Sequence, residues 1–383
     1  MIEMYTAYTA EIDEVDDAIE ELFGQIDLGN LKKNSVGIIS CYYDFIETGV
    51  VQELVERLPF GVVGYTAMAS LNDGDFGMYR LGLTVLTSDD VVFESTMTTA
   101  LTAENYEEEI AKTYQEARRK LPSDPAFIIS YFPIPADISG YDLTVAMDRA
   151  CGGIPVWGGM SSDMDMTYEH CRTIGGGRIE QLGIAMILIH GDVEPEFILT
   201  SIPEENIREY SALITESSGC TLVTVNDMKP QAYLDSVGLK LTAENSATIP
   251  LLVDYGDGST PVALGIFHVH ENGDVLCGGE MPKGKTFSVG DISAEGIIET
   301  ATISLNDALG SGKRSGLLLM PCVTRYIMLA PKQNAELEFV SEFLGDNIPY
   351  AMAYAGGEVC PVLDNDGKLH NRFHNYTFTA CIL

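Results

Sequence analysis

The residues best suited to chemistry gather near the end of the chain, in the segment YAGGEVCPVLDNDGKLHNRFHNYTF (354–378). A glutamate, a cysteine, two histidines and several amides surround one turn, so a metal site, a nucleophile and a binding pocket all have to be weighed. His370 and His374 are four residues apart, which suits a metal ion on a helix. Their neighbours favour a turn and a strand, where residues four apart lie about 13 Å from each other. The sequence therefore predicts no metal site. It predicts a pocket-lining segment that contributes Glu358, His374 and Asn375 to ligand binding, and in which Asn375 and Thr377 hold Glu358.

A cysteine upstream of this segment offers a second chemistry. Cys322 lies in MPCVTRY, three residues before Arg325, and a thiolate with His374 as its base could act as a nucleophile. No catalytic-cysteine signature surrounds Cys322, and buried cysteines are common at strand ends. A thiol enzyme is kept as an alternative hypothesis. Enzymatic activity stays undecided, and the sequence favours binding over catalysis.

These residues have to be positioned by three stretches that share one pattern, at 35–70, 126–163 and 316–359. Each contains a short apolar run, a polar turn, a segment with helical periodicity, a proline and a second apolar run that ends in small residues. Such apolar runs predict strands that are buried on both faces, and an intervening helix makes two strands parallel. The chain is therefore predicted to contain three βαβ units.

The second strand of each predicted unit ends in glycines and small polar residues. Ligands collect beyond the carboxyl ends of parallel strands, and glycine there lets backbone N–H groups approach a ligand closely. We therefore expect the following strand-end residues to contribute to a ligand pocket: Gly64, Thr66, Gly158, Gly159, Ser161, Asp163 and Gly357.

Antiparallel elements are predicted between the units. Hairpins are expected at 80–98, around Ser88–Asp90, and at 264–281, around Asn272–Gly273. Helices are expected near 10–23, 104–121, 230–238 and 291–309. The helix near 230 begins at Lys229–Pro230, with the proline in its first turn. The predicted class is α/β, with mixed sheets built from βαβ units and hairpins, in two domains at 1–229 and 230–383.

Composition limits the classes of partner. The 57 acids and 22 bases among 383 residues give a formal net charge of −35. Such a surface repels phosphate backbones and anionic membranes, so neither nucleic acid nor membrane is expected as a partner. No basic, apolar leader and no apolar run of about 18–20 residues occurs, and the eight cysteines form no CxxC pair. A cytoplasmic protein with reduced thiols is expected.

Three C-terminal stretches, LLLMPCVTRYIML (317–329), IPYAMAYAGGEVCPV (348–362) and RFHNYTF (372–378), resemble the signature of the FIST family's C-terminal domain. The stretches GVVGYTAMAS (61–70) and 154–191 resemble its N-terminal domain, although Tyr65 and Met68 stand where relatives carry small residues. The resemblance covers nearly all of the chain beyond about residue 34. The matching C-terminal positions are Cys322, Arg325, Gly357, Glu358, Pro361, His374, Asn375 and Thr377.

The resemblance implies a sensory protein that binds a small ligand, such as an amino acid or a related metabolite. It also implies a protein that acts alone or through a signalling partner. Arg325 and Glu358 together would suit a zwitterion, since an arginine binds a carboxylate and a glutamate accepts an ammonium. The alternative for this pair is an ion pair between two loops. No cofactor is expected. A haem-bound gas or redox sensor, with one of the six histidines as axial ligand, is the alternative that the resemblance adds.

Overall fold

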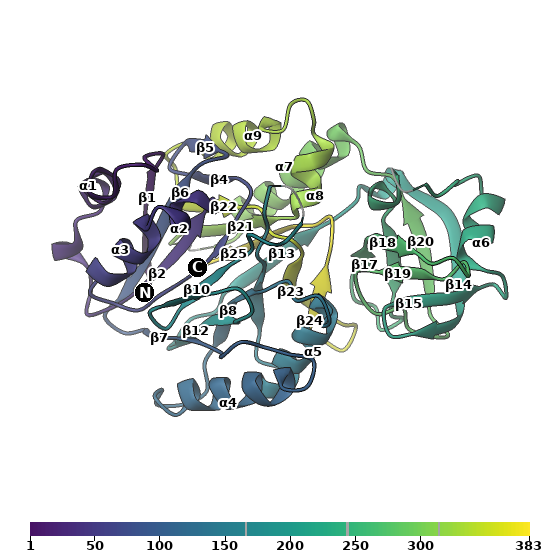
Figure 1. Cartoon of the computed structure of the whole chain (residues 1–383), viewed down its shortest axis with the longest axis horizontal. Coiled ribbons are helices and arrows are strands. Elements are labelled where there is room, and N and C mark those ends of the chain that lie inside the picture. Colours follow the sequence, from purple (N-terminus) through teal and green to yellow (C-terminus); the bar gives the residue numbers. More distant parts are fainter. Residues whose placement is uncertain (165–166, 243–244, 313–314) are drawn as a thin grey trace.

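The computed structural model describes residues 1–164, 167–242, 245–312 and 315–383. Figure 1 shows a large body and a smaller one beside it, which consists of β14–β20 and α6. The smaller body is an insertion at residues 207–290, here named the insert domain. The predicted α/β class with mixed sheets is confirmed, because helices and strands alternate along much of the chain and the strands form four mixed or antiparallel sheets.

The large body consists of three repeats with the same order of elements: strand, helix, strand, helix, strand, hairpin, strand. The first repeat contains β1 (Glu3–Thr9), α1 (Val15–Gln25), β2 (Asn34–Cys41), α2 (Asp44–Glu47), α3 (Val50–Arg57), β3 (Val62–Thr66), β4 (Ser70–Asn72), β5 (Asp75–Gly77) and β6 (Leu81–Ser88). The second contains β7 (Val92–Met97), α4 (Tyr106–Arg118), β8 (Phe127–Phe132), α5 (Gly140–Cys151), β9 (Val156–Met160), β10 (Thr173–Gly175), β11 (Arg178–Glu180) and β12 (Ala185–His190).

The third repeat is interrupted by the insert domain after its first strand. It contains β13 (Glu196–Thr200), α7 (Ala294–Gly310), β21 (Leu317–Pro321), α8 (Val323–Met328), α9 (Ala335–Leu344), β22 (Tyr350–Ala353), β23 (Glu358–Leu363), β24 (Leu369–His374) and β25 (Phe378–Ile382). The insert domain contains β14 (Ile207–Ser218), β15 (Thr221–Val225), α6 (Pro230–Ser236), β16 (Leu251–Asp254), β17 (Val262–Leu264), β18 (Ile266–Val269), β19 (Val275–Cys277) and β20 (Thr286–Gly290).

The three predicted βαβ units are confirmed by the strand pairing. β2 and β3, β8 and β9, and β21 and β22 are parallel pairs with helices between them. Each repeat also gives its hairpin to another repeat: β4–β5 joins β22, β10–β11 joins β3, and β23–β24 joins β9. The three sheets of the large body are therefore each completed by a different repeat.

The strand ends of the three repeats meet through hydrogen bonds. Ser162 N donates to Thr66 O at 2.9 Å, and Gly356 N donates to Met160 O at 2.9 Å. The first and third repeats meet directly, because Tyr354 N donates to Ala69 O at 3.1 Å. The Ser162 hydroxyl also links them, since it accepts from Met68 N and donates to Tyr354 O, both at 3.1 Å. One buried serine thus joins all three repeats.

The core follows from the alternation of side chains along strands that are covered on both faces. In β12, Ala185, Ile187 and Ile189 belong to the central core between the sheets. Met186 and Leu188 belong to the cluster beneath α4 and α5. Because both faces are apolar, the strand reads as a continuous apolar run. The serines Ser139 and Ser293 begin α5 and α7 by accepting backbone N–H bonds, as helix caps do.

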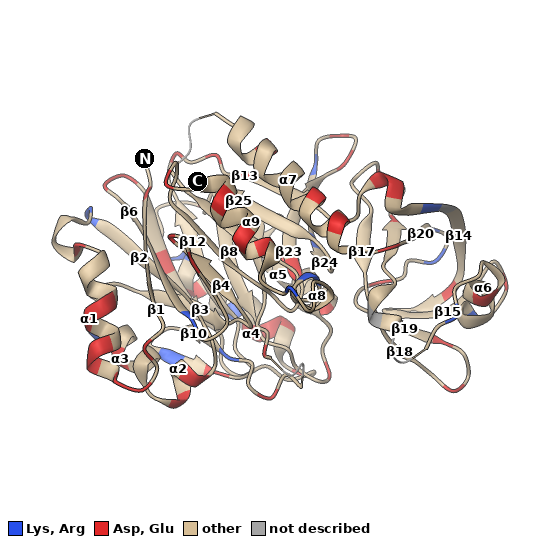
Figure 2. Cartoon of the chain, turned by 90° about the horizontal axis from the view of Figure 1, so that it is seen from above, with Lys and Arg blue, Asp and Glu red and all other residues tan. Residues whose placement is uncertain are grey.

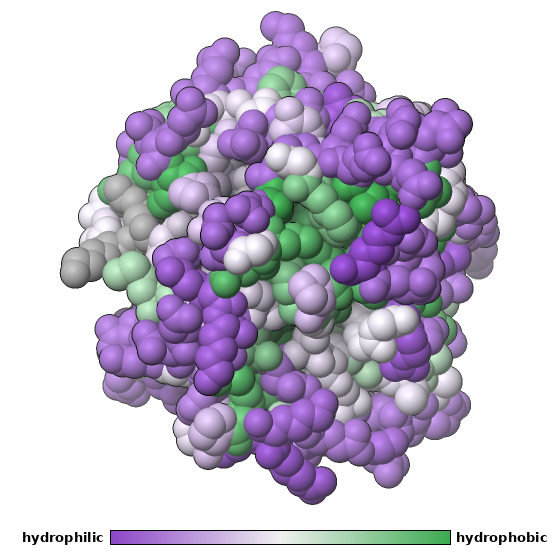
Figure 3. All heavy atoms as spheres, turned by 90° about the vertical axis from the view of Figure 1, so that its left-hand side faces the viewer, coloured by the Kyte–Doolittle hydropathy of each residue, from purple (hydrophilic) through white to green (hydrophobic). Residues whose placement is uncertain are grey.

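The surface is acidic and polar. Acidic residues lie over helices and loops throughout the molecule, and Lys and Arg are few (Figure 2). On the side that carries α1 and α3, apolar residues gather near the centre of the face and hydrophilic residues surround them (Figure 3). Among the described residues, no helix is both long and apolar enough to cross a membrane.

One sequence-based expectation differs in the structure. The strands expected at 80–98 form, but β6 pairs with β1 and β2 whereas β7 pairs with β12, so the predicted hairpin is wrong. This turn joins two repeats, and each strand finds its partners within its own repeat. The hairpin at 264–281 is confirmed by the pairing of β18 with β19. The boundary predicted at residue 229 falls inside the insert domain, between β15 and α6.

Ser162→Ala is expected to lower the free energy of unfolding by about 1–3 kcal/mol, because it leaves Met68 N and Tyr354 O buried without a partner. Urea denaturation measures this loss. Ser161→Ala is the matched control, since its equally buried hydroxyl makes one long hydrogen bond among the described residues, of 3.4 Å to Phe132 O. Equal losses in the two variants would contradict the bridging role of Ser162.

Candidate functional site

The glycines at the strand ends are required by close backbone packing. Gly158 has φ +153°, and a Cβ there would lie 1.8 Å from Ser130 O. A Cβ on Gly357, with φ +152°, would lie 2.4 Å from the Phe373 ring. A Cβ on Gly64 would lie 2.3 Å from Ile39 O, and one on Gly159 would lie 2.6 Å from Met320 Sδ. These four glycines allow neighbouring strands and repeats to approach each other.

The polar strand-end residues are buried and bonded to the protein. Thr66 Oγ1 accepts from Arg172 N at 2.9 Å, and Asp163 Oδ2 accepts from His170 N at 3.3 Å. Ser161 donates to Phe132 O. These bonds attach the segment before β10 to the ends of β3 and β9.

The two residues that depart from the family pattern fill the core. Tyr65 stacks on Tyr131 with ring centroids 4.4 Å apart and donates to Ala353 O. Met68 is buried in the cluster beneath α7 and α9. Their larger volumes are therefore used for packing.

Arg325 is fully buried, and its ion-pair partner is Glu336, not Glu358. Its Nε and Nη2 donate to Glu336 Oε1 at 3.1 and 2.6 Å. The remaining donors bind Thr300 Oγ1, Tyr376 O and Ile297 O. A guanidinium has five N–H donors, and five are used. No donor remains for the carboxylate of a ligand.

Glu358 is also fully buried, and burial favours its protonated form. Burial raises the pKa of Glu358 to about 8, although hydrogen bonding to Thr377 and Cys322 opposes the shift. Thr377 Oγ1 lies 2.6 Å from Glu358 Oε2, as predicted, while Oε1 has no partner among the described residues.

The nearby thiol is not activated. Burial raises the pKa of Cys322, and the neighbouring Glu358 raises it further. A reactive cysteine needs the opposite shift. Burial also lowers the pKa of His374 to about 3, so its ring is neutral. The described contacts do not join His374 to Cys322 as a base and a nucleophile.

Asn375 was predicted to bind the glycine loop, but its described hydrogen bonds go to the insert domain. Its Oδ1 accepts from Gly265 N at 3.0 Å, and its backbone N donates to Ala263 O at 2.8 Å. Tyr376 packs beside it with Leu252 and Ala263 of the insert domain. Asn375, one of the predicted ligand-binding residues, is therefore part of the surface on which the insert domain sits.

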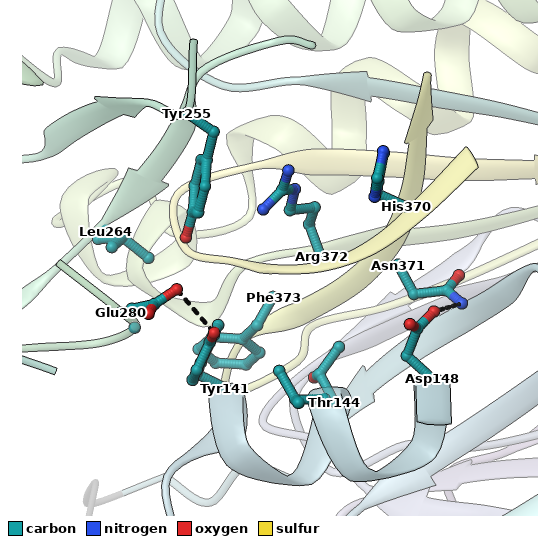
Figure 4. A pocket seen from close by; sticks show the side chains of 12 residues that line it. Tyr141, Thr144, Asp148, Tyr255, Leu264, Glu280, His370, Asn371, Arg372 and Phe373 are labelled. Carbon is teal, nitrogen blue, oxygen red and sulfur yellow. Dashed lines mark hydrogen bonds between the residues drawn. The ribbon is translucent and has the colours of Figure 1, made fainter. Parts of the chain in front are cut away.

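A cavity of about 150 Å³ lies between the insert domain, α5 and β24 (Figure 4). It is lined by Tyr141, Thr144, Val145, Asp148, Tyr255, Leu264, Gly279, Glu280, His370, Asn371, Arg372 and Phe373. Here it is named the interdomain pocket. The sequence predicted that the C-terminal segment 354–378 lines a pocket through its loop. In the structure this segment lines the interdomain pocket through strand β24.

Charged and polar groups meet in the interdomain pocket. The Tyr141 hydroxyl donates to Glu280 Oε2 at 2.7 Å, and Asn371 Nδ2 donates to Asp148 Oδ1 at 2.7 Å (Figure 4). The Arg372 guanidinium lies over the Tyr255 ring, 3.8 Å from its centroid.

The two basic side chains of the pocket already have acidic partners. Arg372 Nη2 lies 2.7 Å from Asp257 Oδ2, and His370 Nε2 lies 2.9 Å from Asp364 Oδ2. Burial raises the pKa of Tyr255 to about 12, with Arg372 acting against the shift. The sequence could not reveal this site, because its walls come from residues more than 100 positions apart.

Arg325→Met is expected to lower the free energy of unfolding by about 3–5 kcal/mol, because Glu336 stays buried without its cation. The double variant Arg325→Met/Glu336→Leu is expected to lose less, since it removes both charges. Urea denaturation compares the two. A larger loss of unfolding free energy in the double variant than in Arg325→Met would show that the unpaired Glu336 charge does not cause most of the destabilisation.

Glu358 is expected to make stability depend on pH. The folded protein keeps a proton up to about pH 8 that the unfolded chain releases near pH 4.3. The stability from this group is therefore full below about pH 4 and is lost as the pH rises toward 8. Glu358→Gln should remove this slope from unfolding free energies measured between pH 4.5 and 8. Glu338→Gln, at an exposed site on α9, is the control. An unchanged slope in Glu358→Gln would refute the assignment.

Comparisons with known proteins identify the family. The FIST N domain matches residues 35–228, and the FIST C domain matches residues 231–361. No curated protein matches the chain. Among solved structures, cyanuric acid hydrolase from A. caulinodans aligns over 100% of this chain and 98% of that chain, with 12% identity and a TM-score of 0.39. Because the two domain matches cover most of its length, the chain belongs to the FIST family.

Proposed function

We propose that this protein is a small-ligand sensor whose ligand binds in the interdomain pocket. The observation that carries the proposal is the cavity itself, which lies between two bodies and brings two acids, a guanidinium, an imidazole, an amide and the aromatic rings of two tyrosines and a phenylalanine together. Pockets with a few convergent polar groups at a domain junction are common ligand sites. The association of FIST domains with sensory and signalling roles supports this assignment.

The size of the pocket limits the ligand. A cavity of about 150 Å³ is comparable to one that holds a benzene molecule. An amino acid or a related metabolite of that size is the class we propose. Such a ligand would touch both bodies, so its binding would alter their contact. The signal would then pass to a partner protein.

The two alternatives find less support in the geometry. A haem is far larger than the interdomain pocket, and His370, the histidine that lines it, is held by Asp364. The residues of this pocket therefore do not fit a haem. A thiol enzyme would need an activated Cys322, and burial shifts its pKa the other way. The free state of all eight cysteines supports a reducing compartment, and we propose the cytoplasm.

A thermal-shift screen with small amines, amino acids and carboxylates tests the proposal. A ligand that binds only the folded state adds about 2.7 kcal/mol of stability at a concentration a hundred times its Kd. We expect at least one compound to raise the melting temperature of the wild type. Val145→Trp, which fills the pocket from α5, should abolish the shift.

Val55→Trp is the matched control, since Val55 is also half-buried on a helix but lies on α3, away from the pocket. It should keep the ligand response. A shift that persists in Val145→Trp would place the ligand elsewhere, and a panel without any shift would argue against the proposed function.

A further inference from the structure

We infer that the interdomain pocket selects a small organic cation that carries a neutral oxygen, as an amino alcohol does, over a zwitterionic amino acid. This inference rests on the proposed function and names the chemical class of its ligand. It follows from the charges around the pocket and from the two polar groups that still have bonding capacity.

The pocket walls carry an excess of negative charge. Asp148 and Glu280 are acids of the wall, and Arg372 is its one permanent cation among the residues that line it. Asp257 lies 2.7 Å from Arg372 and compensates that cation. A ligand with a net positive charge therefore reduces the imbalance. A zwitterion leaves it unchanged, and an anion increases it.

Glu280 offers a place for an ammonium group. Among the described residues, Tyr141 makes the one hydrogen bond that reaches its carboxylate, so further acceptor capacity remains. The rings of Tyr141, Tyr255 and Phe373 line the same cavity. Aromatic faces beside a carboxylate are a favourable environment for an organic cation. Figure 4 shows Glu280 and Tyr141 on one side of the cavity.

Arg372 offers a donor to the other end of the ligand. Its Nε is buried and has no partner among the described residues, while its Nη2 binds Asp257. The guanidinium lies over the Tyr255 ring, with its carbon 3.8 Å from the ring centroid. Because Asp257 already compensates its charge, Arg372 gains little from a second carboxylate. A hydroxyl oxygen satisfies Nε without adding negative charge.

Matched ligand pairs test this inference directly. Ethanolamine and glycine have similar length and share the ammonium group, but they differ in carrying a hydroxyl or a carboxylate. The same holds for 3-aminopropan-1-ol and β-alanine. Isothermal titration calorimetry with the full chain is expected to give at least tenfold tighter binding for the amino alcohol of each pair. Glycolate, which keeps the hydroxyl but is an anion, should bind most weakly.

Two variants assign the preference to the named groups. Glu280→Gln should weaken amino alcohol binding at least tenfold, while Glu271→Gln, at an exposed turn of the insert domain, should leave it unchanged. Asp257→Asn removes the acid that compensates Arg372, so it should move the preference of each pair toward the amino acid.

The outcomes separate the two levels of the proposal. Tighter binding of glycine and β-alanine by the wild type would overturn the inference and leave a small-ligand sensor in place. Failure of all five compounds to bind would overturn the inference. Failure of the whole screening panel would overturn the proposed function as well. The wild-type comparison decides between charge classes even where a variant fails to fold.

Discussion

The exchange of hairpins among the three repeats is the constraint on which the other features depend. Each sheet of the large body is completed by a hairpin from another repeat, so no repeat can form its full sheet alone. The strand ends have to converge for this exchange, and the Ser162 hydroxyl satisfies two backbone groups at their meeting point. Backbone groups that are buried without partners are costly. The convergence therefore requires glycines and small polar residues at the positions where a ligand site would otherwise be expected.

Buried charge explains the contacts that Arg325 and Glu358, two family-specific residues of the third repeat, make in the structure. Arg325 and Glu336 lie without solvent contact between α7, α8 and α9, and such a pair is tolerated when its hydrogen bonds are complete. Glu358 has no cation of its own because Arg325 is committed to Glu336. Burial favours its neutral form, and its hydroxyl partner is Thr377. The ionisable residues Arg325, Glu336 and Glu358 are therefore part of a buried polar core in the third repeat.

Local patterns in the sequence predicted the βαβ units because they depend on nearby residues. An apolar run, a turn and an amphipathic segment lie within about 35 residues of each other, and the resulting pairs β2–β3, β8–β9 and β21–β22 are parallel. The hairpin predicted at 80–98 failed because strand pairing there is decided by distant partners. The interdomain pocket was missed for the same reason, since Tyr141, Glu280 and Arg372 approach one another only after the insert domain docks.

Strand β24 and the segment after it connect the pocket to the buried polar core. Arg372 and Phe373 line the pocket, and Asn375 binds the insert domain two residues later. Tyr376 O then accepts from Arg325, and Thr377 donates to Glu358. Nearly consecutive residues make all these contacts. A displacement of β24 at the pocket would therefore strain the hydrogen bonds of Tyr376 and Thr377 with Arg325 and Glu358. The same strand therefore connects the wall of the pocket with the hydrogen bonds of the polar core. If the pocket binds a ligand, β24 and the segment after it would provide the connection through which binding could affect the third repeat.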